Sequence, residues 1–537
     1  MITDILESAV RSALCALDVE PMPESIKFER PANRDHGDWS SNVALASAKP
    51  AGRNPRELGQ EIASLISAAP PQHVRSVEVA GPGFVNFRLD DSWLYDVVPS
   101  AAADGPDRFG RSRTDVATKV NIEFVSANPT GPLHAGHARG ACYGDAVASL
   151  LQAVGHEVER EFYINDRGVQ MKTFADSLVA RKAGEDVADD GYAGQYIIDW
   201  AEEMPLHLSE EDALEWGYDF ARADQVEVLA SLGIHFDTWY SERSMVENGK
   251  VEEALADLRA RGVVYEEGGA TWLRSSDFGD DKDRVLIKSD GSYTYLTPDI
   301  SYHRDKFSRA DRLVNVWGAD HHGYVPRMKA AMQALGHDAD ELEIVITQLV
   351  KLIRGGEEVK LSKRTGDLIE LRDIIDEIGA DATRFTYLLS SVDSPQTFDL
   401  ELAASQGMDN PVYYVQMAHA RLRSIQAKVE QAGVAMESPD DVDLAVLTHE
   451  RELELVRQLH EFSDLVALAA RERAPHKLAN WLRDFAAAVH GFYHDCYVLG
   501  DDVAPELTQA RLWLVEAARV GLAAGLGLLG VTAPDSM

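Results

Sequence analysis

The sequence is poor in cysteine, and it has neither a long apolar run nor an excess of basic residues. Cys15, Cys142 and Cys496 are too few and too far apart for a disulfide framework or a zinc knuckle, so we expect reduced thiols and a cytoplasmic location. No apolar run approaches the roughly 20 residues that a membrane helix needs. The acidic, amphipathic N-terminus lacks the cationic start and apolar stretch of a signal peptide. We therefore expect no contact with a membrane.

Acidic residues outnumber basic ones by 89 to 52, which gives a formal net charge of −37. A charge of this sign disfavours non-specific binding of nucleic acid, and we expect no DNA partner. One basic groove could still bind a particular RNA, in a selective and salt-sensitive manner. The simplest interpretation of the charge is an acidic, soluble surface. The 537 residues, 45% of them hydrophobic, suffice for two to four domains with sizeable cores.

The chain divides into three blocks by pattern. Residues 1–110 open with a helical pattern and contain a second helix after Asn54. Val77–Leu89 then alternates as two strands around a Gly-Pro-Gly turn, so this block is predicted to be α+β. The small and turn-forming residues of Pro99–Pro106 are interpreted as a linker.

The second block, residues 112–382, alternates strand and helix patterns, which predicts an α/β fold with a doubly wound, Rossmann-like parallel sheet. An acidic, helical stretch at about 186–242 is interpreted as an insertion into that sheet domain. The third block, residues 383–537, has almost no strand pattern and predicts an all-α bundle. In the second block we expect strands at Val120–Val125, Val158–Ile164, Leu313–Trp317 and Ile344–Thr347.

The run Ala127–His137, Ala-Asn-Pro-Thr-Gly-Pro-Leu-His-Ala-Gly-His, lies between a predicted strand and a predicted helix. His134 and His137 are therefore expected at a strand–loop–helix corner, where free N–H groups and the helix dipole favour phosphate. Gly136 between them lets a nucleotide approach the backbone closely. The alternative is a pair of surface histidines in a loop, which the strand before and the helix after disfavour.

Two lysines further along the chain, Lys360 and Lys363, stand in the run Lys-Leu-Ser-Lys-Arg-Thr-Gly. Their ammonium groups could offset the charge that grows on a departing pyrophosphate. Gly355, Gly356 and Gly366 would give such a loop room to close. Taken alone, the run fits a solvated hairpin equally well. Together with the histidine corner it suggests ATP chemistry at the α-phosphate.

Two further runs carry polar groups. Tyr295 and Asp299 place a phenol and a carboxylate close together, although a helix start with Asp299 near its N-cap explains the same pattern. Trp317–Gly323 follows an apolar strand, at the carboxyl edge where open α/β sheets bind ligands. There we interpret Gly318 and Asp320 as contacts of ATP, with Asp320 on the ribose. A metal site built from Asp320 and the adjacent histidine pair is the alternative, but no further ligand cluster accompanies it.

Several motifs considered together are far more specific than any one alone. They are Asp35-His-Gly-Asp38, Val79–Phe84, Glu123–His137, Tyr163-Ile-Asn-Asp166, Trp317–Gly323, Gly355–Glu358, Asn410–Gln416, Ala418–Arg421 and Leu528–Val531. Over nearly its whole length the chain resembles bacterial-type arginyl-tRNA synthetases, which belong to the class I aminoacyl-tRNA synthetases. The resemblance implies attachment of L-arginine to tRNA(Arg) with Mg²⁺-ATP, through an arginyl-adenylate. It also implies that arginine activation needs tRNA to be present, and we expect a monomer.

The resemblance also assigns catalytic roles. His134 and His137 correspond to the histidine element of class I enzymes, with Gly136 at the nucleotide. Lys360 and Lys363 correspond to the lysine loop, in which leucine replaces the usual methionine and arginine replaces the last serine. Lys363 would act on ATP directly.

For arginine, the resemblance places Glu123, Ser126 and Asn128 at the α-ammonium and carboxylate groups. Tyr295 and Asp299 would form the guanidinium end of the pocket. A carboxylate can accept two parallel N–H bonds from a guanidinium, a geometry that lysine cannot reproduce. No protein-bound metal is expected.

For tRNA, the resemblance places the first block at the tRNA elbow, with Phe84 and Asn86 at the contact positions. The family often has tyrosine where Phe84 stands. The helical third block would bind the anticodon, with Tyr413, Tyr414 and Gln416 as possible contacts. The two tyrosines fit a packed core equally well.

Three other functions fit parts of the pattern. A nucleotidylyltransferase or another ATP-dependent ligase could share the histidine corner, but it would not need the first and third blocks. A catalytically silent tRNA-binding paralogue is disfavoured because the candidate catalytic residues are intact. A synthetase for another amino acid is disfavoured because Asp299 with Tyr295 suits a cationic side chain.

Overall fold

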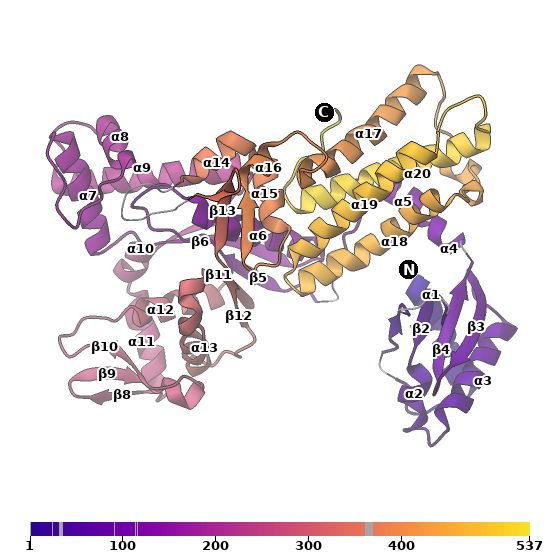
Figure 1. Cartoon of the computed structure of the whole chain (residues 1–537). Coiled ribbons are helices and arrows are strands. Elements are labelled where there is room, and N and C mark those ends of the chain that lie inside the picture. Colours follow the sequence, from indigo (N-terminus) through magenta and orange to yellow (C-terminus); the bar gives the residue numbers. More distant parts are fainter. Residues whose placement is uncertain are drawn as a thin grey trace. The chain divides into compact units, whose positions relative to one another are not determined.

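A computed structural model describes residues 2–23, 25–31, 36–90, 92–112, 114, 116–359 and 369–537. The chain forms two compact units (Figure 1). The first comprises Met1–Ala103, Gly433–His460 and Cys496–Ala517, and the second comprises Asp104–Ala432, Glu461–Asp495 and Ala518–Met537. The block boundaries predicted from the sequence stay predictions, apart from the segments corrected below.

The first unit contains an antiparallel sheet in the order β1-β2-β4-β3. Helix α3 begins where Asn54 accepts hydrogen bonds from the Arg56 and Glu57 amides, with Pro55 at its first position. The predicted helices and the strand pair around Gly81–Gly83 are confirmed. The elements are α1 Ile2–Ala16, β1 Phe28–Glu29, β2 Trp39–Ser41, α2 Val43–Ala48, α3 Pro55–Ala68, β3 Val74–Ala80, β4 Phe84–Leu89, α4 Ser92–Tyr95 and α5 Val97–Asp104.

The linker predicted at Pro99–Pro106 was wrong. Residues 97–104 form helix α5, which buries Val98 and Ala101. Pro99 lies in the first turn, where a missing amide costs no helical hydrogen bond, and the alanines that follow favour helix. The small residues therefore reflect a packed helix rather than a flexible segment.

The second unit is built on a five-stranded parallel sheet in the order β12-β11-β5-β6-β7. The predicted Rossmann-like sheet and its four predicted strands are confirmed. The chain leaves the central strand β5 toward β6 on one side and later returns to β11 on the other, so the strand order reverses at the carboxyl end of β5. The strands are β5 Lys119–Glu123, β6 Glu157–Ile164, β7 Thr238–Ser241, β11 Arg312–Gly318 and β12 Leu342–Thr347.

Three helices, α7 Val169–Lys182, α8 Gln195–Glu203 and α9 Glu210–Ser231, pack around a core that includes Phe174 and Trp200. The predicted insertion at 186–242 therefore contains two of these helices, but its last part was wrong. Residues 238–241 form β7, an edge strand of the parallel sheet. A four-residue strand is too short to show a period of two.

The second unit also carries a small antiparallel sheet in the order β10-β9-β8. Its neighbours are helices whose apolar faces share one core with it, and that core includes Leu255, Leu286, Ile300 and Met332. The elements are α10 Glu242–Glu247, α11 Lys250–Ala260, β8 Val264–Glu267, β9 Ala270–Leu273, η2 Ser275–Phe278, β10 Arg284–Ile287, α12 Leu296–Phe307, η3 Ala319–Tyr324 and α13 Val325–Ala334.

A second small sheet follows, in the order β14-β13-β15. Strands β13 and β14 form a hairpin through Gly355 and Gly356, both in the left-handed region that this turn requires. Strand β15 lies within the block predicted to be all-α, so that prediction was wrong for residues 396–399, and the boundary at 382 falls inside α15. The elements are β13 Val350–Arg354, β14 Glu357–Glu358, α14 Leu371–Ile378, α15 Ala380–Leu388 and β15 Gln396–Asp399.

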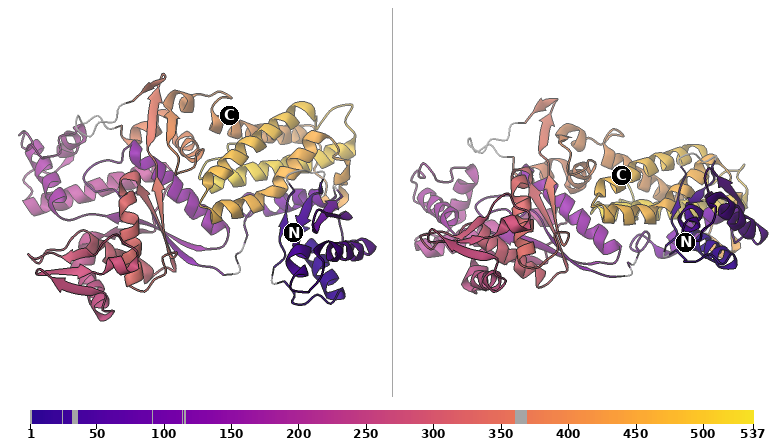
Figure 2. Two further views of the ribbon diagram at one scale, coloured as in Figure 1. Left: turned by 60° about the horizontal axis from the view of Figure 1, so that its bottom comes forward. Right: turned by 90° about the horizontal axis from the view of Figure 1, so that it is seen from below.

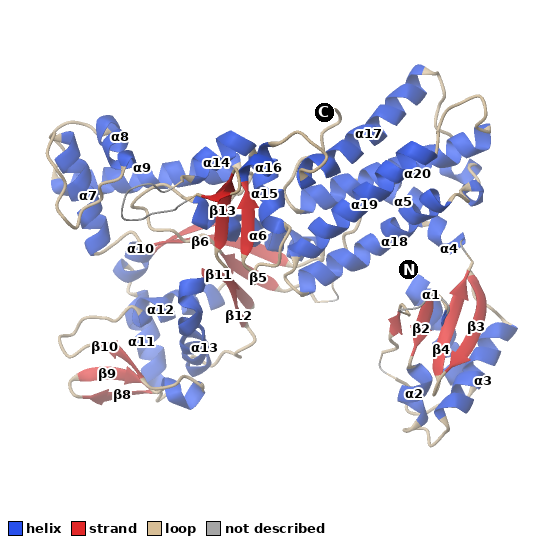
Figure 3. Cartoon of the chain, in the orientation of Figure 1, coloured by secondary structure: helices blue, strands red, loops and turns tan. Residues whose placement is uncertain are grey.

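The chain after β15 forms helices and loops alone (Figure 3), as predicted. Helices α17 and α19 lie side by side in the second unit (Figure 2). These elements are α16 Leu400–Ala404, α17 Pro411–Gln431, η4 Pro439–Asp441, η5 Leu444–Val446, α18 Glu450–Arg471, α19 Pro475–Asp495 and α20 Pro505–Leu528.

One buried arginine joins four segments of the second unit. Arg384 on α15 is 1% exposed and forms an ion pair of 2.5 Å with Asp145 on α6 Ala135–Ala153. Its guanidinium also donates to the carbonyl oxygens of Leu529 and Leu232, both at 2.9 Å. Leu529 follows α20 and Leu232 ends α9, so one side chain holds α6, α9, α15 and the end of α20 together.

Candidate active site

The carboxyl end of β5 turns through a strained segment. Val125 and Ser126 have φ of 68° and 41°, in the left-handed region that residues other than glycine rarely occupy. A β-branched residue there costs free energy, and such conformations concentrate at functional sites. The Ser126 hydroxyl accepts from the Tyr163 amide (3.2 Å) and donates to Glu123 (3.0 Å), which ties this turn to β6 and β5.

The two histidines lie at the start of α6, as predicted. His134 is the N-cap, and its Nδ1 accepts from the Gly136 amide at 3.1 Å. The His134 amide donates to Nδ1 of His137 at 3.2 Å, and the ring centroids are 3.9 Å apart. Because each Nδ1 is an acceptor, each neutral ring carries its proton on Nε2, as a donor to phosphate oxygen requires. A Cβ on Gly136 would lie 2.8 Å from the His134 ring, so this close approach requires glycine.

The predicted lysine loop falls outside the described residues, because Lys360 and Lys363 belong to the segment 360–368. The flanking chain is described on both sides. Before the segment is the hairpin of β13 and β14. After it, Ile369 accepts from the Ala135 amide (3.0 Å), and the Leu371 amide donates to Leu133 (2.8 Å). The chain thus returns directly to the histidine corner.

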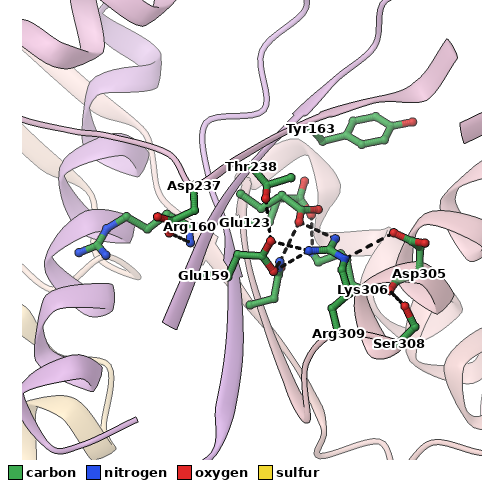
Figure 4. A network of polar contacts seen from close by, with 12 residues as sticks. Glu123, Glu159, Arg160, Tyr163, Asp237, Thr238, Asp305, Lys306, Ser308 and Arg309 are labelled. Carbon is green, nitrogen blue, oxygen red and sulfur yellow. Dashed lines mark hydrogen bonds and ion pairs between the residues drawn. The ribbon is translucent and has the colours of Figure 1, made fainter. Parts of the chain in front are cut away.

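Glu123 is buried and already has a cationic partner. Its carboxylate accepts from the Lys306 ammonium at 2.8 Å (Figure 4), and Lys306 is fully buried on α12. Burial opposes ionisation of Glu123, but the charge of Lys306 and the hydrogen bonds from Lys306 and Ser126 hold its pKa below the usual value. The charge of Glu123 is therefore balanced before any substrate binds.

Asp299 has the opposite environment. It is half-buried in the first turn of α12, and Tyr324 donates a hydrogen bond of 2.6 Å to its carboxylate. Burial raises its pKa to about 7; the Tyr324 hydrogen bond opposes that rise, and the negative charges of Glu242 and Glu123 add to it. A carboxylate in such a site favours a cation.

A second carboxylate, Glu242, faces the same region. Burial raises its pKa, Arg167 and a hydrogen bond from Tyr163 lower it, and Asp166 adds to the rise. Asp166 fixes its position by accepting from the Ser241 hydroxyl (2.6 Å) and the Arg243 amide (2.9 Å) on either side of it. Sequence reasoning missed Glu242, Lys306 and Tyr324. The position of Glu242 directly after a Trp-Tyr-Ser strand end was the available signal.

Two predicted arginine contacts, Tyr295 and Asn128, have exposed side chains. Tyr295 precedes α12 as its N-cap and is 90% exposed, so the phenol on Asp299 belongs to Tyr324 instead. Asn128 is exposed, and its amide donates to Gln170 at 2.9 Å. The predicted helix start is confirmed: α12 begins at Leu296, and Asp299 lies in its first turn.

Gly318 ends β11, at the same sheet edge as the end of β5. A Cβ on Gly318 would lie 2.7 Å from an oxygen of Asp320, so glycine lets this exposed carboxylate lie against the backbone. Asp320 is exposed and lies 3.6 Å from the exposed His321 ring. Within the described ranges no group of three His, Cys, Asp or Glu side chains is arranged to hold a metal ion.

The predicted RNA contacts divide into exposed and buried residues. Phe84 is 40% exposed at the start of β4, whereas Asn86 is buried and accepts from the Ser40 hydroxyl at 2.7 Å. Gln416 is buried and donates to Asp381 (2.7 Å) and to the Thr532 carbonyl (2.9 Å). Tyr414 packs against His490, and Tyr413 is half-buried. The buried amides stabilise the fold, and RNA contact stays a prediction for all five.

A parallel sheet with a histidine pair at the start of the helix after its central strand is typical of class I aminoacyl-tRNA synthetases, and the matching family model assigns the chain to that class. The family model "tRNA synthetases class I (R), catalytic domain" matches residues 105–214 and 218–396. "Arginyl tRNA synthetase N terminal domain" matches residues 2–89, and "DALR anticodon binding domain" matches residues 415–537. The chain therefore belongs to the arginyl-tRNA synthetases, a family whose activity is that of an arginine–tRNA ligase.

Individual relatives match over nearly the full length. The chain is 44% identical to an arginine–tRNA ligase of Staphylococcus epidermidis, over 99% of this chain and 98% of the relative. It is 46% identical to that of Syntrophotalea carbinolica, over 96% and 95%. The structure of Thermus thermophilus arginyl-tRNA synthetase superposes over the whole of both chains with a TM-score of 0.77 at 24% identity, which shows a shared fold.

No helix of the described chain is both long and apolar enough to cross a membrane.

Proposed function

We propose that the carboxyl edge of the parallel sheet joins L-arginine to ATP. A carboxylate oxygen of arginine attacks the α-phosphorus, the bond from that phosphorus to the bridging oxygen breaks, and pyrophosphate leaves. The 2′-hydroxyl of the terminal adenosine of tRNA(Arg) then attacks the arginyl carbonyl and releases AMP. The observation that carries this proposal is the pair Asp299 and Glu242, two carboxylates whose pKa burial raises and which repel one another. Glu242 has a partly exposed cation, Arg167, at 3.8 Å, and Asp299 accepts only a neutral hydrogen bond from Tyr324 among the described side chains.

The arginine guanidinium would lie between Asp299 and Glu242, and its charge would lower the raised pKa of both. Tyr324 orients Asp299 for this contact. Ser126, Asn128 and the buried Glu123 would hold the α-ammonium and carboxylate end. The exposed Tyr295 would close over the guanidinium from the solvent side.

The nucleotide would lie along the turn from β5 to α6, with Mg²⁺-ATP as the substrate. His134 and His137 donate from Nε2 to the phosphates, Gly136 leaves room for the nucleotide, and Gly318 and Asp320 lie at the ribose. Lys360 and Lys363 would balance the charge on the departing pyrophosphate. Positioning and charge stabilisation suffice for this first step, because it needs little acid–base chemistry.

For tRNA, we propose contact of the elbow with the N-terminal sheet through Phe84 and of the anticodon with residues 415–537 through Tyr413. Three further predicted contacts would act indirectly, by fixing the backbone conformation of these two surfaces; they are Asn86, Tyr414 and Gln416. A monomeric, cytoplasmic enzyme is part of the same proposal. Arginine activation would depend on bound tRNA.

The decisive experiment is the attachment of radiolabelled arginine to total tRNA with Mg²⁺-ATP, at low and at high salt. Lysine, glutamate and cysteine serve as controls. We expect charging with arginine alone, weakened by salt because phosphate contacts release counterions. Binding of tRNA without charging by any amino acid would instead identify a silent paralogue and overturn the proposal.

Arginine affinity should rise with pH. Asp299 has a pKa of about 7 and that of Glu242 is also raised, yet the guanidinium needs both ionised. Below pH 7, arginine binding must expel a proton from Asp299. The Kd for arginine should therefore fall about tenfold per pH unit between pH 5.5 and 7, and it should level off by pH 8. Calorimetric titration across this pH range measures the Kd for arginine, and a parallel titration with ATP serves as the control. An arginine Kd that does not change with pH would contradict the proposed guanidinium site.

A further inference from the structure

A continuous chain of buried polar groups connects the two ends of the proposed arginine pocket. Lys306 donates to Glu123 at 2.8 Å and to Oδ1 of Asn315 at 2.7 Å. Nδ2 of Asn315 lies 2.7 Å from Nε2 of His303, and Nδ1 of His303 lies 2.8 Å from the Asp299 carbonyl oxygen. Lys306, Asn315 and His303 are 0%, 0% and 3% exposed. All three side chains are therefore buried, and their hydrogen bonds join one another, Glu123 and the backbone of Asp299.

The geometry follows from two regular elements. Asp299, His303 and Lys306 recur at i, i+4 and i+7 on α12, so they share one face of that helix. Asn315 on β11 lies directly opposite Glu123 on β5 in the strand pairing. The helix face thus presents its lysine to a carboxylate and an amide that the sheet holds side by side.

The proton positions form one consistent sequence. Lys306 can only donate, so Oδ1 of Asn315 accepts and its Nδ2 donates. His303 must then accept at Nε2 and carry its proton on Nδ1, from which it donates to the Asp299 carbonyl oxygen. Burial, and next the charge of Lys306, lower the pKa of His303 to about 4, so the ring is neutral as this sequence requires.

We propose that Lys306 is a positioning residue for arginine. It keeps Glu123 ionised for the α-ammonium group and, through Asn315 and His303, fixes the turn of α12 that presents Asp299 to the guanidinium. The distance between the two ends of the pocket would thereby be matched to the length of arginine. This inference rests on the proposed arginine roles of Glu123 and Asp299.

Other charged groups near Glu123 do not replace Lys306. On α12, Tyr302 lies with its ring 4.8 Å from the Lys306 ammonium, and burial raises its pKa. On β6, burial raises the pKa of Tyr163, while Glu161 is paired with Arg309 at 2.6 Å. Arg309 also binds Glu159, within the same network of polar contacts as Glu123 and Lys306 (Figure 4). Lys306 is the cation whose nitrogen reaches Glu123 among the described side chains.

The test is the variant Lys306→Met. Its affinities for arginine and for ATP are measured from pH 6.5 to 9. Arginine-dependent ATP–pyrophosphate exchange is measured over the same range, with tRNA present. Without Lys306, the buried Glu123 carboxyl should hold a proton at neutral pH. We expect the arginine KM to rise at least about 30-fold at pH 7, the ATP KM to change less than about threefold, and the arginine defect to shrink as pH rises. Equal, pH-independent losses for both substrates would overturn the proposal and leave a purely structural role.

Two further variants complete the design. Lys250→Met removes an ion pair to Asp305 on the same helix α12 without touching Glu123, and its arginine KM should stay within about twofold of the unmodified enzyme. The double variant Glu123→Gln with Lys306→Met removes both buried charges together. No unpaired charge is then left in the interior, so we expect this variant to fold even if Lys306→Met does not. It should bind arginine weakly at every pH, and recovery at high pH would overturn the assigned role of Glu123.

Failure of this inference is distinguishable from failure of the proposed function. If the unmodified enzyme does not activate arginine at all, the proposed function fails. If it activates arginine and Lys306→Met does so with an unchanged arginine KM and pH profile, only the role of Lys306 fails.

Discussion

Replacing Asp299 by asparagine should strongly reduce arginine activation while stabilising the ligand-free protein. The activity should fall about 10³-fold, because truncating one partner of a buried charge pair costs about 2–5 kcal/mol and each 1.4 kcal/mol is tenfold. Asparagine still accepts the hydrogen bond from Tyr324 but cannot balance a guanidinium charge. Loss of substrate binding and gain of stability would thus come from the same carboxylate.

The sign of the stability effect follows from the pKa of Asp299. Its pKa rises from 3.8 in the unfolded chain to about 7 in the fold, so ionisation destabilises the folded state. The penalty is absent below pH 3.8, grows through the interval and is complete above pH 7. It has an upper limit of about 4 kcal/mol, since one pKa unit corresponds to about 1.4 kcal/mol and solvent reaches part of the half-buried side chain.

Calorimetric melting at pH 5 and pH 8 and arginine-dependent ATP–pyrophosphate exchange measure both effects. Asp299→Asn should melt higher than the unmodified protein, by more at pH 8 than at pH 5. The matched control is Asp189→Asn, which changes an exposed aspartate and should alter neither quantity. Two results would refute the assignment of Asp299 as the carboxylate that binds the guanidinium. One is a melting temperature of Asp299→Asn below that of the unmodified protein at pH 8, and the other is an exchange rate above about a tenth of the original.

The histidine corner could be predicted because its determinants are local. An apolar strand, a glycine-containing turn and a helical period stand in sequence order, and the close approach of His134 to Gly136 is set by three consecutive residues. The same holds for Asp299, whose place in the first turn of α12 follows from its own segment. The Rossmann-like sheet could be predicted for the same reason, because its four long strands carry their own apolar patterns.

The rest of the site depends on contacts between distant segments. The phenol that reaches Asp299 comes from Tyr324, 25 residues away, whereas the nearer Tyr295 points to solvent. In the sequence Lys306 looks like an ordinary helix-surface lysine, and only the fold brings its ammonium within 2.8 Å of the Glu123 carboxylate. Asn315 was the available clue, since an amide in the apolar strand Leu-Val-Asn-Val-Trp needs a buried polar partner.

Short elements were missed because a pattern needs length. Strands β7 and β15 have four residues each, too few to show alternation, and their partners β6 and β13 lie far away in the sequence. Helix α5 was taken for a linker because its small residues fit both states, and burial of Val98 decides between them. Tertiary packing, absent from any local window, selected these structures.

The largest stability loss should come from Arg384→Met. The substitution leaves the carbonyl oxygens of Leu529 and Leu232 without their buried donor, and it removes one of the two cations that balance Asp145. Removing one partner of a buried pair costs about 3–5 kcal/mol, and Arg160, which still contacts Asp145 at 2.9 Å, keeps the loss near the lower figure. Four segments meet at this guanidinium, so the loss should be shared by α6, α9, α15 and the end of α20.

Urea unfolding followed by circular dichroism, with amide hydrogen exchange at residues 526–531, measures this loss. The matched control is Arg354→Met, which breaks an ion pair of the same length to Glu377 between side chains that are 49% and 39% exposed. Screening by water limits that pair to less than about 1 kcal/mol. Equal urea midpoints for the two variants would show that the Arg384 contacts contribute little.

Gly530→Ala tests the same cluster independently, because Gly530 has φ of 68° and its Cβ would overlap the Arg384 guanidinium. Since both changes disrupt one contact, the double variant should lose less stability than the sum of the two.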